Sequence, residues 1–244
     1  MMTYRIAICA CLGLLLSPLT MAGSREVVLE ILNNSPSTRG SPDAKSWRIF
    51  FDGCLEMTAP PSELSDTFNM NTVWPDMANW SVVADWASQN EHMEGIFIES
   101  AKRTLVGLPY GSENVPTEYR ENGIYAEIGV DGQLHNFHFA YVDSVQLACL
   151  WVTVETYRLL ENGEIDRAIQ LLTSELIVLR KFCDREFLKE QLTFMPMLGD
   201  ALSNTRDMFF RYRESITPPQ FRSIAKDGIP YLRIDPTRLL MPEG

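Results

Sequence analysis

The chain has 244 residues, of which 45% are hydrophobic, and carries 21 Lys and Arg against 32 Asp and Glu. Its net charge of −11 disfavours nucleic-acid binding, because such a chain repels phosphate backbones. The hydrophobic content is ordinary for a globular protein, and five cysteines in a chain of this length argue against a disulfide-rich scaffold.

Residues 1–22 have the pattern of a secretory signal peptide. Arg5 supplies a positive charge, residues 6–16 are apolar, Ser17-Pro18 interrupts the helix, and small residues precede Gly23. The apolar run is shorter than the roughly 20 residues of a membrane-spanning helix. We therefore expect cleavage before Gly23 and a periplasmic or extracellular product with no membrane span. Loss of Arg5, the only charged residue removed, changes the net charge from −11 to −12.

Residues 23–57 predict a brief arm or helix, a linker and then a helix. Residues 23–41 pass from an apolar stretch into a cluster of Ser, Asn, Pro and Gly, which is typical of a linker. Ser41, Pro42 and Asp43 follow as a helix start, and the helix should end near residue 57. Its apolar residues at helical spacing are Trp47, Phe50, Phe51 and Cys54.

Residues 58–123 predict alternating loops and helices. Residues 58–74 show little periodicity and predict a loop, and residues 107–123 predict an irregular segment rich in Gly and Pro. Between them, residues 75–90 and 91–104 predict two consecutive helices. The apolar stripes of these helices are Met77, Trp80, Ala84 and Ala87 in the first, and Met93, Ile96, Phe97 and Ala101 in the second.

Residues 124–142 allow two interpretations. Asp131-Gly132 is a strong signal for a two-residue β-hairpin turn, and apolar residues flank it on both sides. The alternation of apolar and polar residues is imperfect, however. The sequence therefore leaves a small hairpin and an irregular segment as alternatives.

The C-terminal half predicts a helical hairpin. Asp143 and Gln146 resemble a capping box that opens a helix reaching residue 161, and apolar residues surround this helix, as is typical of a central buried element. Asn162-Gly163 predicts a turn, and an amphipathic helix should follow to about Cys183. Antiparallel packing would separate Cys149 from Cys183 by about 10 Å along the helix, too far for a disulfide.

Asp184 predicts the start of a further helix, kinked at Pro196 and Gly199. This helix places Leu188, Leu192, Met195, Leu198 and Leu202 on one face. A last short helix should open at 217–220, before an irregular tail. The predicted fold is a single, mainly α domain over residues 42–242, an irregular helical bundle centred on the hairpin.

Part of the hairpin resembles the turn and second helix of a tetratricopeptide repeat. The residues that match the family pattern in register are Leu159, Gly163, Ile165, Ala168 and Leu172. Glu175 and Arg180 depart from the pattern, and a shift by the 34-residue period reveals no second repeat. The resemblance covers about residues 145–183, and the family implies protein or peptide binding. The chain as a whole resembles uncharacterised exported helical proteins of bacteria, which implies no activity.

The candidate metal ligands are His135 and His138, near Asp131 and Asp143. Zinc sites combine His with carboxylates or thiolates, usually three or four ligands. On a strand, residues three apart point to opposite faces, so the alternative is a polar surface segment. No nucleotide-binding motif occurs, and no cofactor is expected.

The sequence contains no nucleophile motif, but it is rich in acids. A pair of carboxylates could serve a glycoside hydrolase, and the alternative is a solvated acidic face. The candidate acids are Glu56, Glu63, Asp66, Asp76, Asp85, Glu91, Glu94 and Glu99; tryptophans 47, 74, 80 and 86 could form a carbohydrate platform or belong to the core. We expect a non-enzymatic exported protein that binds another protein or a cell-surface component. The alternative is a carboxylate-dependent hydrolase acting on glycan or peptide.

Overall fold

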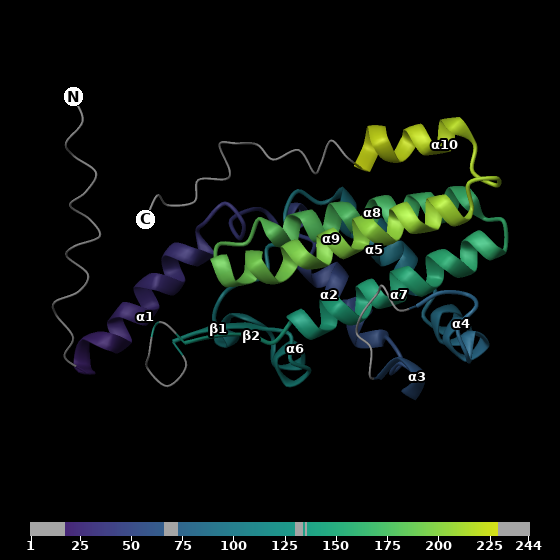
Figure 1. Cartoon of the computed structure of the whole chain (residues 1–244). Helices are drawn as coiled ribbons and strands as arrows, with labels where there is room; N and C mark the ends of the chain where they lie inside the picture. The colour runs from purple at the N-terminus through teal and green to yellow at the C-terminus, as the bar shows by residue number, and fades with distance from the viewer. Residues whose placement is uncertain (1–17, 66–72, 130–133, 135, 229–244) are drawn as a thin grey trace, which may run out of the picture.

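The computed structural model describes residues 18–65, 73–129, 134 and 136–228. These residues are mainly helical, with a two-stranded antiparallel sheet, which confirms the predicted fold class and its small β-hairpin (Figure 1). The elements are α1 (Pro18–Asn33), α2 (Trp47–Glu56), α3 (Ser62–Ser65), α4 (Trp80–Gln89), α5 (His92–Lys102), α6 (Thr117–Glu121), β1 (Ala126–Ile128), β2 (Phe137–Phe139), α7 (Val142–Glu161), α8 (Ile165–Cys183), α9 (Leu188–Arg211) and α10 (Pro218–Ser223).

Helices α7 and α8 form the centre of the molecule. α7 packs against α2, α4, α8 and α9, and α8 packs against α5, α7 and α9 (Figure 1). Because neighbours lie on several sides of α7, its buried residues surround the helix axis, as the sequence predicted. Trp151 of α7 is fully buried, and its indole N–H donates to the carbonyl of Ala87 at 3.0 Å.

The turn between α7 and α8 lies at the predicted Asn162-Gly163. Gly163 adopts φ 77°, a left-handed conformation that favours glycine. The amide of Glu164 donates to the carbonyl of Leu159 at 2.8 Å, which closes the end of α7. The two helices therefore form the expected hairpin. Its cysteines, Cys149 and Cys183, are both free, in accordance with the predicted separation.

Two predicted helix starts and one predicted helix cap are wrong. Residues 42–44 form only a 3₁₀ turn, and α2 begins at Trp47, because the amide of Ser46 donates to the carbonyl of Leu105 and holds this backbone outside the helix. α4 begins at Trp80 after Asn79 in a left-handed conformation, rather than at Pro75. α7 begins at Val142 without a side-chain cap, so the capping box at Asp143 is absent.

The loops flanking α4 and α5 contain more helix than the sequence predicted. A one-turn helix, α3, interrupts the predicted loop over residues 58–74. In the segment 107–123, expected to be irregular, Ser112–Asn114 form a 3₁₀ turn and α6 follows. The buried stripe of α4 is Val83, Trp86 and Ala87.

The β-hairpin pairs β1 with β2, in the register Ala126 with Phe139 and Ile128 with Phe137. Its predicted turn at Asp131-Gly132 lies outside the described residues. The rings of Phe137 and Phe139 lie 4.6 and 5.7 Å from that of Phe187, just before α9. The hairpin thus covers the N-terminal end of α9.

Helix α1 runs through the expected cleavage site and packs on the hairpin end of the molecule. Arg25 binds Glu113 through both guanidinium nitrogens, at 2.7 and 3.0 Å, and Glu127 at 2.5 Å. Leu29 is buried, and Asn33 exchanges hydrogen bonds with the backbone of Tyr110. The segment predicted as an arm is therefore anchored by specific contacts. Within the part of the chain that is described, no helix has both the length and the apolar character needed to cross a membrane.

Candidate functional site

Helix α9 is the longest described helix. Its first residue and the composition of its buried side both differ from the sequence prediction. It begins at Leu188, four residues after the predicted cap, and continues past Pro196 and Gly199 to Arg211. The stripe that faces the core mixes polar with apolar residues. Its members are Glu190, Phe194, Met197, Ala201, Asn204, Thr205, Met208 and Phe209.

The inner stripe is fixed by a buried network of Arg185, Glu190, Tyr110 and Tyr141, called here the Arg185–Glu190 network. The side chains of Arg185 and Glu190 are both 0% exposed, and their Nε and Oε1 atoms lie 3.0 Å apart. Tyr110 donates to Glu190 Oε2 at 2.6 Å, and Tyr141 donates to Oε1 at 2.5 Å. Arg185 Nη1 also donates to the carbonyl of Leu108 at 2.5 Å, so the network joins α9 to the loop before the hairpin.

Burial and charge together shift the pKa values of this network. Burial raises the pKa of both Tyr110 and Tyr141 well above the usual range. Burial is the largest single effect on the pKa of Arg185 and lowers it, but the charge and hydrogen bond of Glu190 together with the two tyrosines raise it further, so the net pKa is raised. The guanidinium lies 4.0 Å from the ring centroid of Tyr110. The network is closed to solvent and ties Glu190 of α9 to Arg185, Tyr110 and Tyr141.

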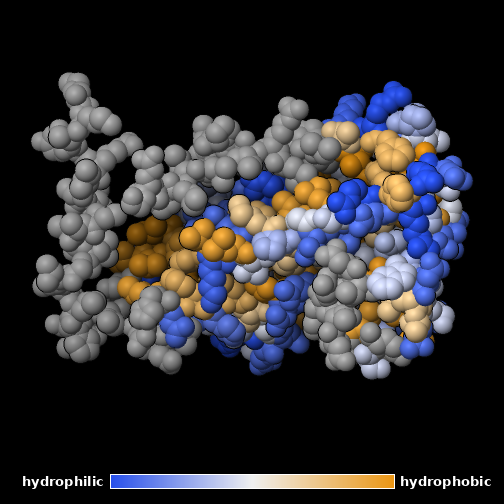
Figure 2. All heavy atoms as spheres, in the orientation of Figure 1, coloured by the Kyte–Doolittle hydropathy of each residue, from blue (hydrophilic) through white to orange (hydrophobic). Residues whose placement is uncertain are grey.

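The outer face of α9 carries the five apolar residues that the sequence placed on one stripe. Four of them are exposed, with exposed fractions of 55% for Leu188, 60% for Leu192, 45% for Met195 and 38% for Leu202. The fifth, Leu198, packs partly against the core. In Figure 2 hydrophobic residues alternate with polar ones along α9 on the side turned to the viewer. The shared face predicted from the sequence is therefore present, but most of it points to solvent.

Pro196 and Gly199 lie exposed on this outer side. Proline has no N–H, so the carbonyl of Leu192, four residues earlier, lacks its usual helical donor. At Gly199 an added Cβ would meet no atom of the described residues within 4 Å. Gly and Pro cost a helix about 1 and about 3 kcal/mol relative to Ala, and at Gly199 no contact among the described residues accounts for that cost.

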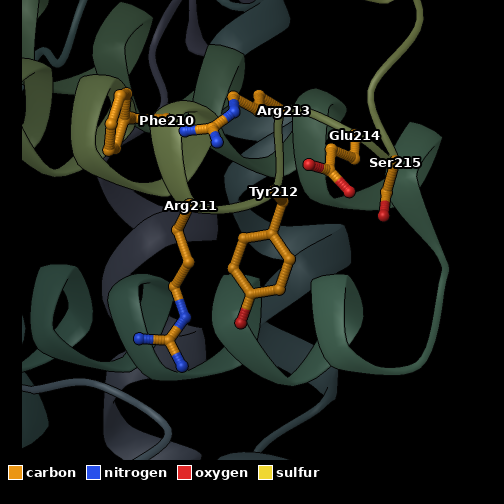
Figure 3. Close-up of a pocket in the computed structure, with 6 residues that line it drawn as sticks. All are labelled: Phe210, Arg211, Tyr212, Arg213, Glu214 and Ser215. Atoms are coloured by element: carbon orange, nitrogen blue, oxygen red, sulfur yellow. The ribbon is translucent and has the colours of Figure 1, made fainter.

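A shallow depression lies where α9 ends and the chain turns toward α10 (Figure 3). Its volume is about 350 Å³, and it is lined by Phe210, Arg211, Tyr212, Arg213, Glu214 and Ser215. The Arg213 guanidinium lies 4.9 Å from the ring centroid of Phe210, which is 70% exposed. Arg211 instead binds Asp76 at 2.7 Å, and the hydroxyl of Tyr212 donates to Glu161.

A second depression, of about 270 Å³, separates α8 from α10. Its lining contains one carboxylate, Asp166, which accepts a hydrogen bond from Gln220 at 2.7 Å. The first depression also contains one carboxylate, Glu214. Neither lining therefore supplies the carboxylate pair that glycoside hydrolysis requires.

The acids proposed from the sequence are dispersed over the described surface, except that Glu91 and Glu94 share one arginine. Glu91 and Glu94 both bind Arg167, Asp76 binds Arg211, and Glu99 binds Lys102. The side chains of Glu56 and Asp85 are exposed, whereas the placement of the Glu63 side chain and of Asp66 lies outside the description. Of the tryptophans, Trp47 and Trp86 are buried, so the four do not share a surface.

The candidate metal ligands are only partly described. His138 of β2 is exposed, with Nδ1 3.3 Å from the Tyr125 hydroxyl, and Asp143 is exposed at the start of α7. His135 and Asp131 lie outside the described residues. Among the residues that the structure places, no three His, Cys, Asp or Glu side chains are grouped so as to hold a metal ion.

Glu175 of α8 is a buried acid that the sequence analysis named only as a departure from the tetratricopeptide pattern, not as a candidate for chemistry. Burial raises its pKa to about 8, and the Cys149 thiol forms a hydrogen bond with it. The pKa of Cys149 is itself raised well above its usual value by burial. These groups lie inside the bundle, where neither reaches a substrate, so the exposed candidate is the outer face of α9.

Comparisons with protein-family models, curated proteins and solved structures found no match to the chain.

Proposed function

We propose that this chain is an exported, non-enzymatic protein-binding module whose binding surface is the outer face of α9. The observation that carries this proposal is the exposure of Leu188, Leu192, Met195 and Leu202 along one side of a fixed helix. Burial of apolar surface stabilises a complex by about 25 cal/mol per Å². An exposed row of apolar residues on an ordered helix is therefore a binding surface whose shape exists before the partner arrives.

A helix of the partner fits this surface best. The exposed residues recur at intervals of four, three and seven along α9, which is the spacing of a helix–helix contact. Gly199 lies within the stripe and lets a second backbone approach closely. The tetratricopeptide resemblance of α7 and α8 supports the same class of function, because that family binds proteins and peptides.

Export rests on the N-terminal pattern of residues 1–22. Cleavage before Gly23 would leave Arg25 as the third residue of the mature chain. The contacts of Arg25 with Glu113 and Glu127 would then anchor the new N-terminus to the β-hairpin end of the molecule. N-terminal sequencing of secreted protein should therefore begin at Gly23.

A photo-crosslinking experiment tests the binding surface. Benzoylphenylalanine is placed at position 192 in the exported protein, and at position 170 as a control, because Gln170 is exposed on α8 away from the outer face of α9. We expect an adduct from position 192 and none from position 170. The protein in the adduct, identified by mass spectrometry and purified, should bind the wild-type chain and lose at least tenfold in affinity for the variant L192E. Equal adducts from both positions, or none, would overturn the proposal.

A further inference from the structure

The outer face of α9 is symmetric in sequence about Met195. Leu192 and Leu198 each lie three residues from Met195, and Leu188 and Leu202 each lie seven residues from it. At 100° per residue, all five project within an arc of about 120° on the helix. Because the apolar residues have the same spacing on either side of Met195, the stripe can pack against an identical stripe when two helices meet antiparallel.

A two-fold axis through Met195 gives this pairing a definite register. Leu188 of one copy reaches the level of Leu202 of the second copy, and Leu192 reaches the level of Leu198. Gly199 lies on the same side of the contact as Leu192 of the second copy. The space beside Gly199, where an added Cβ would meet nothing within 4 Å, thus receives that leucine.

We propose that the helix taken up by the outer face of α9 is α9 of a second copy of this chain, packed antiparallel about a two-fold axis at Met195. This inference rests on the proposed function and names its partner. A 24-residue helix is about 36 Å long and about 10 Å wide, so the contact buries less than the about 800 Å² per partner of a standard interface. A contact of this size is typical of a weak, reversible dimer.

Sedimentation equilibrium of the purified full-length protein measures this dimer. We expect the weight-average mass to rise from that of a monomer toward that of a dimer as the protein concentration is raised, as mass action requires of a reversible dimer. The variant L192E should weaken dimerisation at least tenfold, whereas Q170E, which adds the same charge on exposed α8 surface, should leave it unchanged. Circular dichroism verifies that both variants remain folded.

Two further variants test the register. Gly199→Leu meets no atom of the residues that the structure places within 4 Å of the new Cβ, so it should fold normally and yet lose the dimer by filling the space that receives Leu192 of the second copy. Met195→Cys lies on the two-fold axis and should cross-link to itself under mild oxidation. Ser203→Cys, eight residues away, should not. A chain that stays monomeric at all concentrations, or a dimer insensitive to both L192E and G199L, would overturn the inference.

The two proposals fail in different ways. If the chain is monomeric but position 192 cross-links to a different protein, the proposal that the partner is a second copy is wrong, and the proposal that the outer face of α9 is a binding surface is supported. If position 192 gives no adduct of either kind, both proposals are wrong.

Discussion

Replacing Glu190 with glutamine should destabilise the protein strongly. Glu190 is the only carboxylate that the structure shows in contact with the fully buried guanidinium of Arg185, and it also accepts hydrogen bonds from Tyr110 and Tyr141. The variant E190Q keeps the size of the side chain but removes its charge. Arg185 then remains charged and buried, because its pKa is too high for it to lose a proton on folding.

The expected magnitude follows from the burial of both partners. Removing one member of a buried ion pair costs about 3–5 kcal/mol, since the other charge is left unpaired in a medium that solvates it poorly. In a domain of this size, that loss lowers Tm by roughly 10 °C. An exposed ion pair behaves differently: Glu99 and Lys102 are both largely exposed, and salt and water screen their contact.

Urea denaturation followed by circular dichroism measures the difference. E190Q should shift the unfolding midpoint markedly to lower urea, with an unchanged slope, and E99Q should leave the midpoint near that of the wild type. The double variant R185M/E190Q should recover part of the loss, because it removes the unpaired charge together with its partner. A midpoint for E190Q within error of the wild type would show that the network does not stabilise the fold.

The remaining predictions concern one buried acid and one turn. The pKa of Glu175 is raised from 4.5 to about 8 by burial, so the folded protein holds this proton more tightly than the unfolded chain does, and stability should fall as pH rises from about 5 to about 8. In E175Q, urea midpoints measured across this range should lose that component of the decline. At the α7–α8 turn, Gly163→Ala should cost about 1 kcal/mol because φ is 77°, whereas Gly95→Ala, in α5 with open space around its Cβ, should stabilise by about 0.5–1 kcal/mol in the same assay.

The sequence predicted best the elements whose local signals agree with their surroundings. Asn162-Gly163 separates two long periodic segments, and the turn lies there because glycine alone reaches φ 77° without strain. Apolar residues on every side of residues 143–161 could only belong to a helix with neighbours on several sides. The sequence left the β-hairpin and an irregular segment as alternatives. The hairpin is the one observed, and its Phe137 and Phe139 pack on Phe187, which is distant in the sequence.

Helix starts were predicted less well, because contacts distant in sequence determine them. Pro42 and Asp43 are residue types that favour the start of a helix. The backbone of Lys45 and Ser46 is instead paired with the backbone near Leu105, so α2 begins only at Trp47. The buried side of α4 includes Trp86 rather than Trp80, since Trp86 donates to the carbonyl of Thr58 across the loop. Partners this distant in the chain are not visible in the pattern of neighbouring residues from which a helix is predicted.

The candidate site depends on a helix, α9, that carries apolar residues on both its buried and its exposed side. A simple hydrophobic pattern would turn Leu188, Leu192 and Leu202 inward and leave Glu190 outside, since apolar burial is favourable and charge burial is not. The structure does the opposite because Arg185, Tyr110 and Tyr141 satisfy Glu190 completely inside the bundle. The buried network thereby fixes the rotation of α9 about its axis.

That fixed rotation connects the stability of the fold to the proposed binding surface. If Glu190 and Arg185 were both replaced by apolar residues, the inner stripe would lose the contacts that distinguish it from the outer one, and α9 could turn its leucines toward the core. Stability could then be retained while self-association through Met195 is lost. The buried ion pair would in that case specify which face of α9 is exposed, a role separate from its contribution to the free energy of folding.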